Sequence, residues 1–197
     1  MSDPETLKVY ADKAEEYATL VSGQTPTDPL LTAFIALFSK GADVLDLGCG
    51  PGHAAHAMAD AGLTVTATDA VPEMVARAGN HPSVTAYVAT FDDIAGDAVY
   101  DGIWANFCLL HAPRADMPHY LTALHTALKP QGILHIALKT GTGEQRDPIG
   151  RLYTYYTDAE LTDLLNTAGF TVTNRTTGRD IGLDGVPANW IALRAYG

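Results

Sequence analysis

The first forty residues show apolar side chains at helical spacing. Apolar residues stand at positions 7, 10, 14, 17 and 18, and charged side chains occupy the other faces. This pattern predicts a helix over residues 6–21 and a break at residues 22–26. A second helix is expected over residues 28–39, where Asp28 can cap the turn before Pro29. Residues 1–40 are therefore assigned to N-terminal helices that precede the first strand.

After residue 42 the pattern changes to short apolar runs that alternate with helical segments. Strands are predicted at residues 43–47, 63–68, 84–88, 100–106, 133–138, 170–173 and 190–195. Helices are predicted at residues 53–61, 72–78, 117–128 and 158–168. This alternation indicates a mainly parallel sheet with helices on both faces. In such sheets, ligands bind beyond the carboxyl ends of the strands.

A glycine-rich loop follows the first predicted strand. Gly48, Gly50 and Gly52 lie between that strand and a helix, where they let the backbone turn sharply and approach a ligand. A dinucleotide-binding loop would have glycine three residues after Gly50, and this chain has His53 there. Asp46 would disfavour a pyrophosphate and suits a ligand with a positive charge. A nicotinamide-dependent dehydrogenase is therefore the least favoured reading.

Asp69 stands at the end of the second predicted strand, 17 residues beyond Gly52. A carboxylate at this point can accept hydrogen bonds from both hydroxyls of a ribose. The alternative is an aspartate that caps the turn before Pro72. Beside the glycine loop we favour the ribose role, so the expected ligand has a ribose, a positively charged end and no required phosphate.

On these residues the chain resembles the class I S-adenosylmethionine-dependent methyltransferases. The resemblance lies in residues 44–52, Asp69, and residues 90–93, 100–106 and 128–134, close over 40–140 and looser elsewhere. It implies a three-layer αβα sandwich with a Rossmann-like, mainly parallel seven-stranded sheet whose last strand is antiparallel. It also implies a single methyltransferase domain over residues 1–197.

The resemblance implies a binding site for S-adenosylmethionine and its product S-adenosylhomocysteine. The glycines would flank the methionyl part, Asp46 would orient it, and two tyrosines of the N-terminal helix would close over its carboxylate. No arginine precedes the glycine loop to bind that carboxylate. Asp69 would bind the ribose, Asp92 the adenine amino group, and the others would line the ring or the methyl group. The implied set is Tyr10, Tyr17, Asp46, Gly48, Gly50, Gly52, Asp69, Ala70, Met74, Phe91, Asp92, Ala105 and Asn106.

The expected acceptor side involves one histidine and one long segment. His111 follows the fourth strand and is a candidate substrate contact or general base, although a packing or turn role is favoured; no other catalytic residue is assigned. Residues 139–157 are too long for an ordinary connection and form a candidate substrate lid, with Arg146, Arg151 and Tyr153 as contacts. A surface loop whose tyrosines pack on the domain is an equally weighted alternative.

Charge and composition restrict the partners. The chain has 12 basic and 23 acidic residues, a net charge of −11, which disfavours nucleic acid and anionic membranes. Residues 129–197 hold seven residues of each sign, so an anionic substrate stays possible there. The seven histidines form no recognised ligand motif, and no metal is expected. Two cysteines and no secretory or membrane-spanning pattern suggest a cytoplasmic protein.

The expected activity is methyl transfer from S-adenosylmethionine to a small molecule by in-line displacement, for which a general base is optional. One alternative is a protein or RNA methyltransferase, whose mark would be an Asn-Pro-Pro-Tyr-like run where this chain reads Asn-Phe-Cys-Leu at residues 106–109. The other is a non-catalytic module that binds or senses S-adenosylmethionine. The acceptor and the oligomeric state are not determined by the sequence.

Overall fold

The computed structural model describes residues 3–22 and 28–197, and side chains for all of these except residues 20–22. Three helices precede the first strand: α1 (Pro4–Asp12), α2 (Ala14–Ser22) and α3 (Pro29–Ile35). The prediction of one helix over 6–21 is wrong, because Lys13 leaves helical geometry (φ −111°, ψ 18°) and divides it in two. The break expected at 22–26 lies almost wholly outside the described residues.

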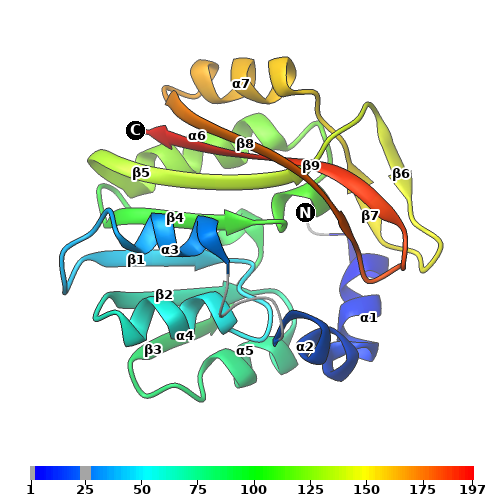
Figure 1. Cartoon of the computed structure of the whole chain (residues 1–197), viewed down its shortest axis with the longest axis horizontal. Helices are drawn as coiled ribbons and strands as arrows, with labels where there is room; N and C mark the ends of the chain where they lie inside the picture. Colours follow the sequence, from blue (N-terminus) through cyan, green and yellow to red (C-terminus); the bar gives the residue numbers. More distant parts are fainter. Residues whose placement is uncertain (1–2, 23–27) are drawn as a thin grey trace.

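A seven-stranded sheet forms the centre of the molecule (Figure 1). Its order is β3 (Val84–Val88), β2 (Thr64–Asp69), β1 (Asp43–Leu47), β4 (Tyr100–Asn106), β5 (Leu128–Lys139), β9 (Pro187–Tyr196) and β8 (Thr171–Ile181). The pairs among the first five strands are parallel, whereas β9 is antiparallel to both of its neighbours. The mainly parallel sheet with an antiparallel last strand is confirmed.

Helices cover both faces of this sheet. Phe34 of α3 and Met58 of α4 (His53–Asp60) pack with Val65 and Trp104 in one cluster, close to α5 (Pro72–Ala78). On the other face, α6 (Met117–Ala127) and α7 (Asp158–Thr167) bury their apolar sides against β4, β5 and β9. The three-layer arrangement therefore follows from apolar runs in the strands that are buried on both sides.

Two parts of the C-terminal third differ from the pattern-based prediction. Strand β8 extends over eleven residues, well beyond 170–173, and most of its side chains are exposed. Its polar sequence shows no apolar alternation. Pairing with β9, rather than burial of one face, holds the strand extended. Within 139–157, two short strands, β6 (Glu144–Arg146) and β7 (Leu152–Thr154), form a separate antiparallel pair. No described helix is long and apolar enough to cross a membrane.

Candidate functional site

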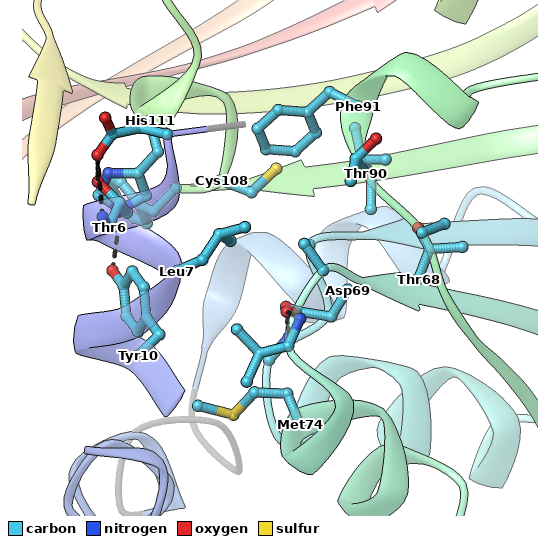
Figure 2. A pocket seen from close by; sticks show the side chains of 18 of the residues that line it. Thr6, Leu7, Tyr10, Thr68, Asp69, Met74, Thr90, Phe91, Cys108 and His111 are labelled. Carbon is cyan, nitrogen blue, oxygen red and sulfur yellow. Dashed lines mark hydrogen bonds between the residues drawn. The ribbon is translucent and has the colours of Figure 1, made fainter. Parts of the chain in front are cut away.

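A pocket opens at the carboxyl ends of β1, β2 and β4, and α1 and α2 lie beyond these strand ends (Figure 1). It contains about 730 Å³ of empty space, which includes open solvent at its mouth. In Figure 2, Leu7 and Tyr10 of α1 face the pocket from one side, and Asp69, Thr90 and Phe91 from the other.

The glycine loop forms the floor of the pocket with bare backbone. Gly48 has φ +63°, and a Cβ on it would lie 2.3 Å from Cβ of Cys108, so no side chain fits there. Gly50 has φ +52°, and a Cβ there would lie 3.3 Å from the ring of Tyr17 on α2. The loop backbone is therefore packed closely against Cys108 and Tyr17, and Gly48 and Gly50 line the pocket.

Asp69 is held at the rim of the pocket by two backbone groups. Its Oδ2 accepts from the amide of Gly50 and its Oδ1 from the amide of Val71, both at 2.9 Å. Burial raises the pKa of this carboxyl, and the backbone N–H groups oppose that shift. Each oxygen keeps a second lone pair, so the carboxylate can still accept from two hydroxyls.

Asp46 lies beneath the glycine loop and is only 2% exposed. Its Oδ2 is buried and has no hydrogen-bond partner among the described residues. Burial raises the pKa of Asp46 to about 7, and a hydrogen bond from the amide of Ala55 partly opposes this. An unpaired carboxylate oxygen next to the pocket floor suits a ligand with positive charge, through a bridging water.

A chain of hydrogen bonds joins α1 to the far side of the pocket. Nη1 of Arg151 donates to the hydroxyl of Tyr10 at 2.8 Å, and that hydroxyl lies 2.9 Å from Nε2 of His111. Nδ1 of His111 lies 2.6 Å from the carbonyl of Leu152, which can only accept. The directions are thereby fixed: Nδ1–H donates to Leu152, and Tyr10 donates to Nε2.

His111 is therefore neutral and has no free lone pair in this arrangement. Burial lowers its pKa to about 3, so it stays unprotonated at neutral pH. Arg151, only 2% exposed, also pairs with Asp147 at 2.7 Å. This ion pair fixes the Arg151 end of the hydrogen-bond chain. It leaves Arg151 facing α1 rather than the empty part of the pocket.

The segment around β6 and β7 is fastened to α1. Arg146 contacts both carboxylate oxygens of Asp3 at 2.8 and 2.9 Å and lies 3.2 Å from Glu5. The amide of Leu152 donates to Oγ1 of Thr6 at 2.8 Å. Residues far apart in the sequence thus hold α1 over the pocket.

The structure brings ten of the expected residues to the pocket lining and leaves the others outside it. The lining residues among them are Tyr10, Tyr17, Gly48, Gly50, Asp69, Ala70, Met74, Phe91, Asn106 and His111. Outside it are Asp46, Gly52, Asp92, Ala105, Arg146, Arg151 and Tyr153. Gly52 packs against Ala78 of α5, and Asp92 is exposed and accepts from the hydroxyl of Tyr120. Tyr153 is buried beside His111, with ring centroids 4.7 Å apart.

The expected set omits several residues that the structure places in the lining. Thr6 and Leu7 lie on the same face of α1 as Tyr10, so the helical period already available in the sequence would have found them. Cys108 follows the end of β4, and no periodic signal marks it. Thr68 and Thr90 lie beside the expected Asp69 and Phe91. Among the described residues, no group of three or more His, Cys, Asp or Glu side chains is placed to hold a metal ion.

Comparison with known proteins identifies the family. A family model described as a methyltransferase domain matches residues 24–174. A malonyl-[acyl-carrier protein] O-methyltransferase of Pseudescherichia vulneris is 36% identical over 127 residues, which cover 62% of this chain and 49% of that protein. An uncharacterized methyltransferase of Synechocystis sp. is 34% identical over 97 residues, which cover 48% of this chain and 46% of that protein. The chain thus spans about half the length of these curated relatives.

A solved structure has a similar fold. A 1,6-didemethyltoxoflavin-N1-methyltransferase of Burkholderia thailandensis, with 1,6-didemethyltoxoflavin and S-adenosylhomocysteine bound, superposes with a TM-score of 0.79 at 24% identity. The match covers 98% of this chain and 87% of that one, and identity at this level shows a shared fold. Since the family model covers most of the sequence and the sheet has the expected seven strands with the last one antiparallel, the chain belongs to the class I S-adenosylmethionine-dependent methyltransferases.

Proposed function

We propose that this protein transfers a methyl group from S-adenosylmethionine to a small-molecule acceptor. The observation that carries the proposal is the position of Asp69, held between two backbone amides at the rim of a glycine-floored pocket. The bound cofactor supplies an electrophilic methyl group on a sulfonium. What the protein must add is alignment of the acceptor with that methyl and exclusion of water.

Each part of the pocket has a role in this proposal. Asp69 accepts from the ribose hydroxyls, and the backbone of Gly48 and Gly50 lies along the methionyl part. The unpaired oxygen of Asp46 favours positive charge above the floor. Met74 and Phe91 supply apolar contacts for the adenine. Since Asp92 is exposed and lies outside the lining, its contact with the adenine amino group requires movement of the loop around residues 90–93.

The acceptor we propose needs no general base. Nε2 of His111 already accepts from Tyr10, and burial holds the pKa of His111 at about 3. An amine, a thiolate or a carboxylate presents a lone pair without first losing a proton to His111. His111 and Tyr10 then act by shaping the acceptor end of the pocket.

A small acceptor fits the closed form of the site better than a polymer does. Helix α1 covers the pocket and is tied down by Arg146 and Arg151. The net charge of −11 disfavours nucleic acid. The 1,6-didemethyltoxoflavin-N1-methyltransferase was solved with 1,6-didemethyltoxoflavin bound, whereas the malonyl-[acyl-carrier protein] O-methyltransferase is named for a substrate on a carrier protein. Two free buried thiols, Cys49 and Cys108, suit a reducing compartment such as the cytoplasm.

Calorimetric titration tests the cofactor part of the proposal. Wild type is expected to bind S-adenosylmethionine and S-adenosylhomocysteine with micromolar affinity and not to bind NAD. Asp69→Asn has one acceptor oxygen, which can serve only one of the two loop amides, and it loses acceptor capacity toward the ribose. It should therefore weaken the binding of both ligands by about tenfold, a loss of about 1.4 kcal/mol. Asp163→Asn, an exposed change on α7 that removes the same charge, is the matched control. Equal affinity of the two variants would contradict the ribose role.

An acceptor screen tests the enzymatic part. Purified protein with S-adenosylmethionine is incubated with panels of small amines, thiols and carboxylates, and S-adenosylhomocysteine is measured. Turnover with one panel supports methyl transfer to that class. Tight cofactor binding without turnover on any panel, or on protein and RNA, favours a module that senses S-adenosylmethionine.

A further inference from the structure

A second hollow lies on the sheet face that α3 covers, away from the cofactor pocket. It is a groove between α3 and the strands β5, β8 and β9, and it holds about 450 Å³ of empty space including its open side. Its lining combines an apolar wall on α3 with polar side chains on the strands. The lining residues are Leu30, Ala33, Phe34, His135, Asn174, Thr176, Ala192, Leu193 and Arg194.

Arg194 is the charged residue of this groove, and it has no carboxylate partner among the described residues. One guanidinium nitrogen donates to Oδ1 of Asn174. Its Nε is buried and has no hydrogen-bond partner within the described chain. The residues whose side chains are not described, 1–2 and 20–27, include no aspartate or glutamate that could pair with it.

Comparison with the other arginines shows that the absence of a carboxylate partner is unusual in this protein. Five of the seven pair with a carboxylate: Arg77, Arg114, Arg146, Arg151 and Arg175. Arg179, which has no ion pair within the described residues, is exposed to solvent, whereas Arg194 is half-buried in the groove. In a chain with a net charge of −11, Arg194 therefore carries a guanidinium on a half-buried side chain, with no carboxylate within the described residues to balance its charge.

The floor of the groove supplies no second cation. His135 is 5% exposed and stacks on Trp104, with ring centroids 3.7 Å apart and an interplanar angle of 13°. Burial, with the nearby charge of Arg194, lowers the pKa of His135 to about 3, so its ring is neutral. Phe34 and Leu30 on α3 form the apolar side, and Thr176 adds a hydroxyl. The groove thus offers one positive charge next to an apolar wall.

We infer that this groove binds a small monocarboxylate with a short apolar chain. The carboxylate pairs with the guanidinium of Arg194, as this planar fork favours, and the chain lies against Leu30 and Phe34. One isolated positive charge suits a singly charged group better than a phosphate. The inference does not depend on the cofactor or on methyl transfer, since no groove residue lines the first pocket.

Titration with sodium butyrate, followed by tryptophan emission, tests the inference. The chain has two tryptophans, so a Trp190→Phe background leaves Trp104, beneath His135, as the only reporter. Butyrate is expected to change the emission saturably with a millimolar Kd. Arg194→Gln should weaken it at least tenfold. Arg179→Gln, which removes an exposed charge of the same kind from β8, should leave the Kd unchanged.

Two other ligands and one further variant test whether the groove recognises a carboxylate. With 1-butanol, which lacks the charge, no saturable change is expected, and a match to butyrate would overturn the carboxylate assignment. Inorganic phosphate at equal ionic strength should bind at least tenfold more weakly, and equal binding would reduce the groove to a general anion site and overturn the proposal. Arg194→Lys keeps the charge without the fork and should weaken butyrate at least threefold. Arg194→Lys also serves as the test variant if Arg194→Gln does not fold. Unchanged affinity of Arg194→Lys for butyrate, or no saturable signal in the protein with Arg194 intact, would refute the inference.

Discussion

Asp46 and His111 are titratable side chains that burial shifts toward their neutral forms, and their effects on stability run in opposite directions with pH. The pKa of Asp46 is raised to about 7, above its ordinary value. The pKa of His111 is lowered to about 3, below its ordinary value. At the residue scale, ionisation of either buried side chain therefore lowers the free energy of unfolding.

Asp46→Asn tests the first of these costs. Since folding raises the pKa of Asp46, its penalty on stability develops as pH rises through about 4 to 7 and is fully present above pH 7. The free energy of unfolding of the variant, minus that of ligand-free wild type, should grow by about 2 kcal/mol between pH 5 and pH 8. Urea unfolding at both pH values measures this. The same variant is expected to bind S-adenosylhomocysteine more weakly. A pH-independent difference in stability would mean that Asp46 titrates near its ordinary pKa in the folded protein.

His111→Gln tests the second cost. Because the folded pKa of His111 lies below the unfolded value, its titration has little effect on stability above pH 6.5 and destabilises the fold increasingly as pH falls toward 3. The stability of wild type relative to the variant should drop by about 2 kcal/mol from pH 8 to pH 5. Urea midpoints at these two pH values give the result. A relative stability that stays constant or rises on acidification would mean that His111 titrates near its ordinary pKa.

Helix α1 and the β6–β7 pair act together at the scale of elements. Residues 144–154 hold α1 through Arg146, Arg151 and the amide of Leu152. The segment expected to be a lid over substrate therefore contacts the helix that covers the cofactor pocket. In this arrangement the segment holds α1 in place over the pocket.

Arg146→Ala is expected to loosen α1 without unfolding the protein. Removing the contacts with Asp3 and Glu5 should speed amide hydrogen exchange in α1 several-fold and leave exchange in β1 and β4 unchanged. Arg175→Ala removes an equally exposed arginine that pairs with Asp158 of α7, and it should not change exchange in α1. Equal exchange in both variants would show that Arg146 does not hold the helix.

The whole molecule is expected to unfold as one unit. Trp104 is 2% exposed in the cluster under α3, and Trp190 lies on β9, where it donates to Asp180 of β8. Since β9 pairs directly with β5, the C-terminal hairpin shares the central sheet. Urea unfolding of Trp104→Phe and Trp190→Phe, each followed by the remaining tryptophan, should give equal slopes of free energy against urea. A β8–β9 hairpin that melted alone would give the Trp190 signal a markedly shallower slope.

Local sequence signals predicted the parts of the fold that depend on local chemistry. The apolar runs of β1, β2 and β4, the glycine loop and Asp69 were assigned correctly in position, because buried parallel strands and positive-φ turns need those residue types nearby in sequence. Local signals failed at β8, whose exposed polar residues are extended by pairing with β9. They failed also at Lys13, where the first helix divides.

The sequence by itself determined the family, the order of strands and helices from β1 to β5, and the chemical character of the pocket floor, since these depend on residues close together in the chain. Only the tertiary structure decided that Arg151 and Tyr10, 141 residues apart, share a hydrogen bond, that His111 has no free lone pair, and that no carboxylate of the described residues pairs with Arg194. These properties depend on which distant side chains meet and on how far water is excluded where they do, and no local pattern encodes either.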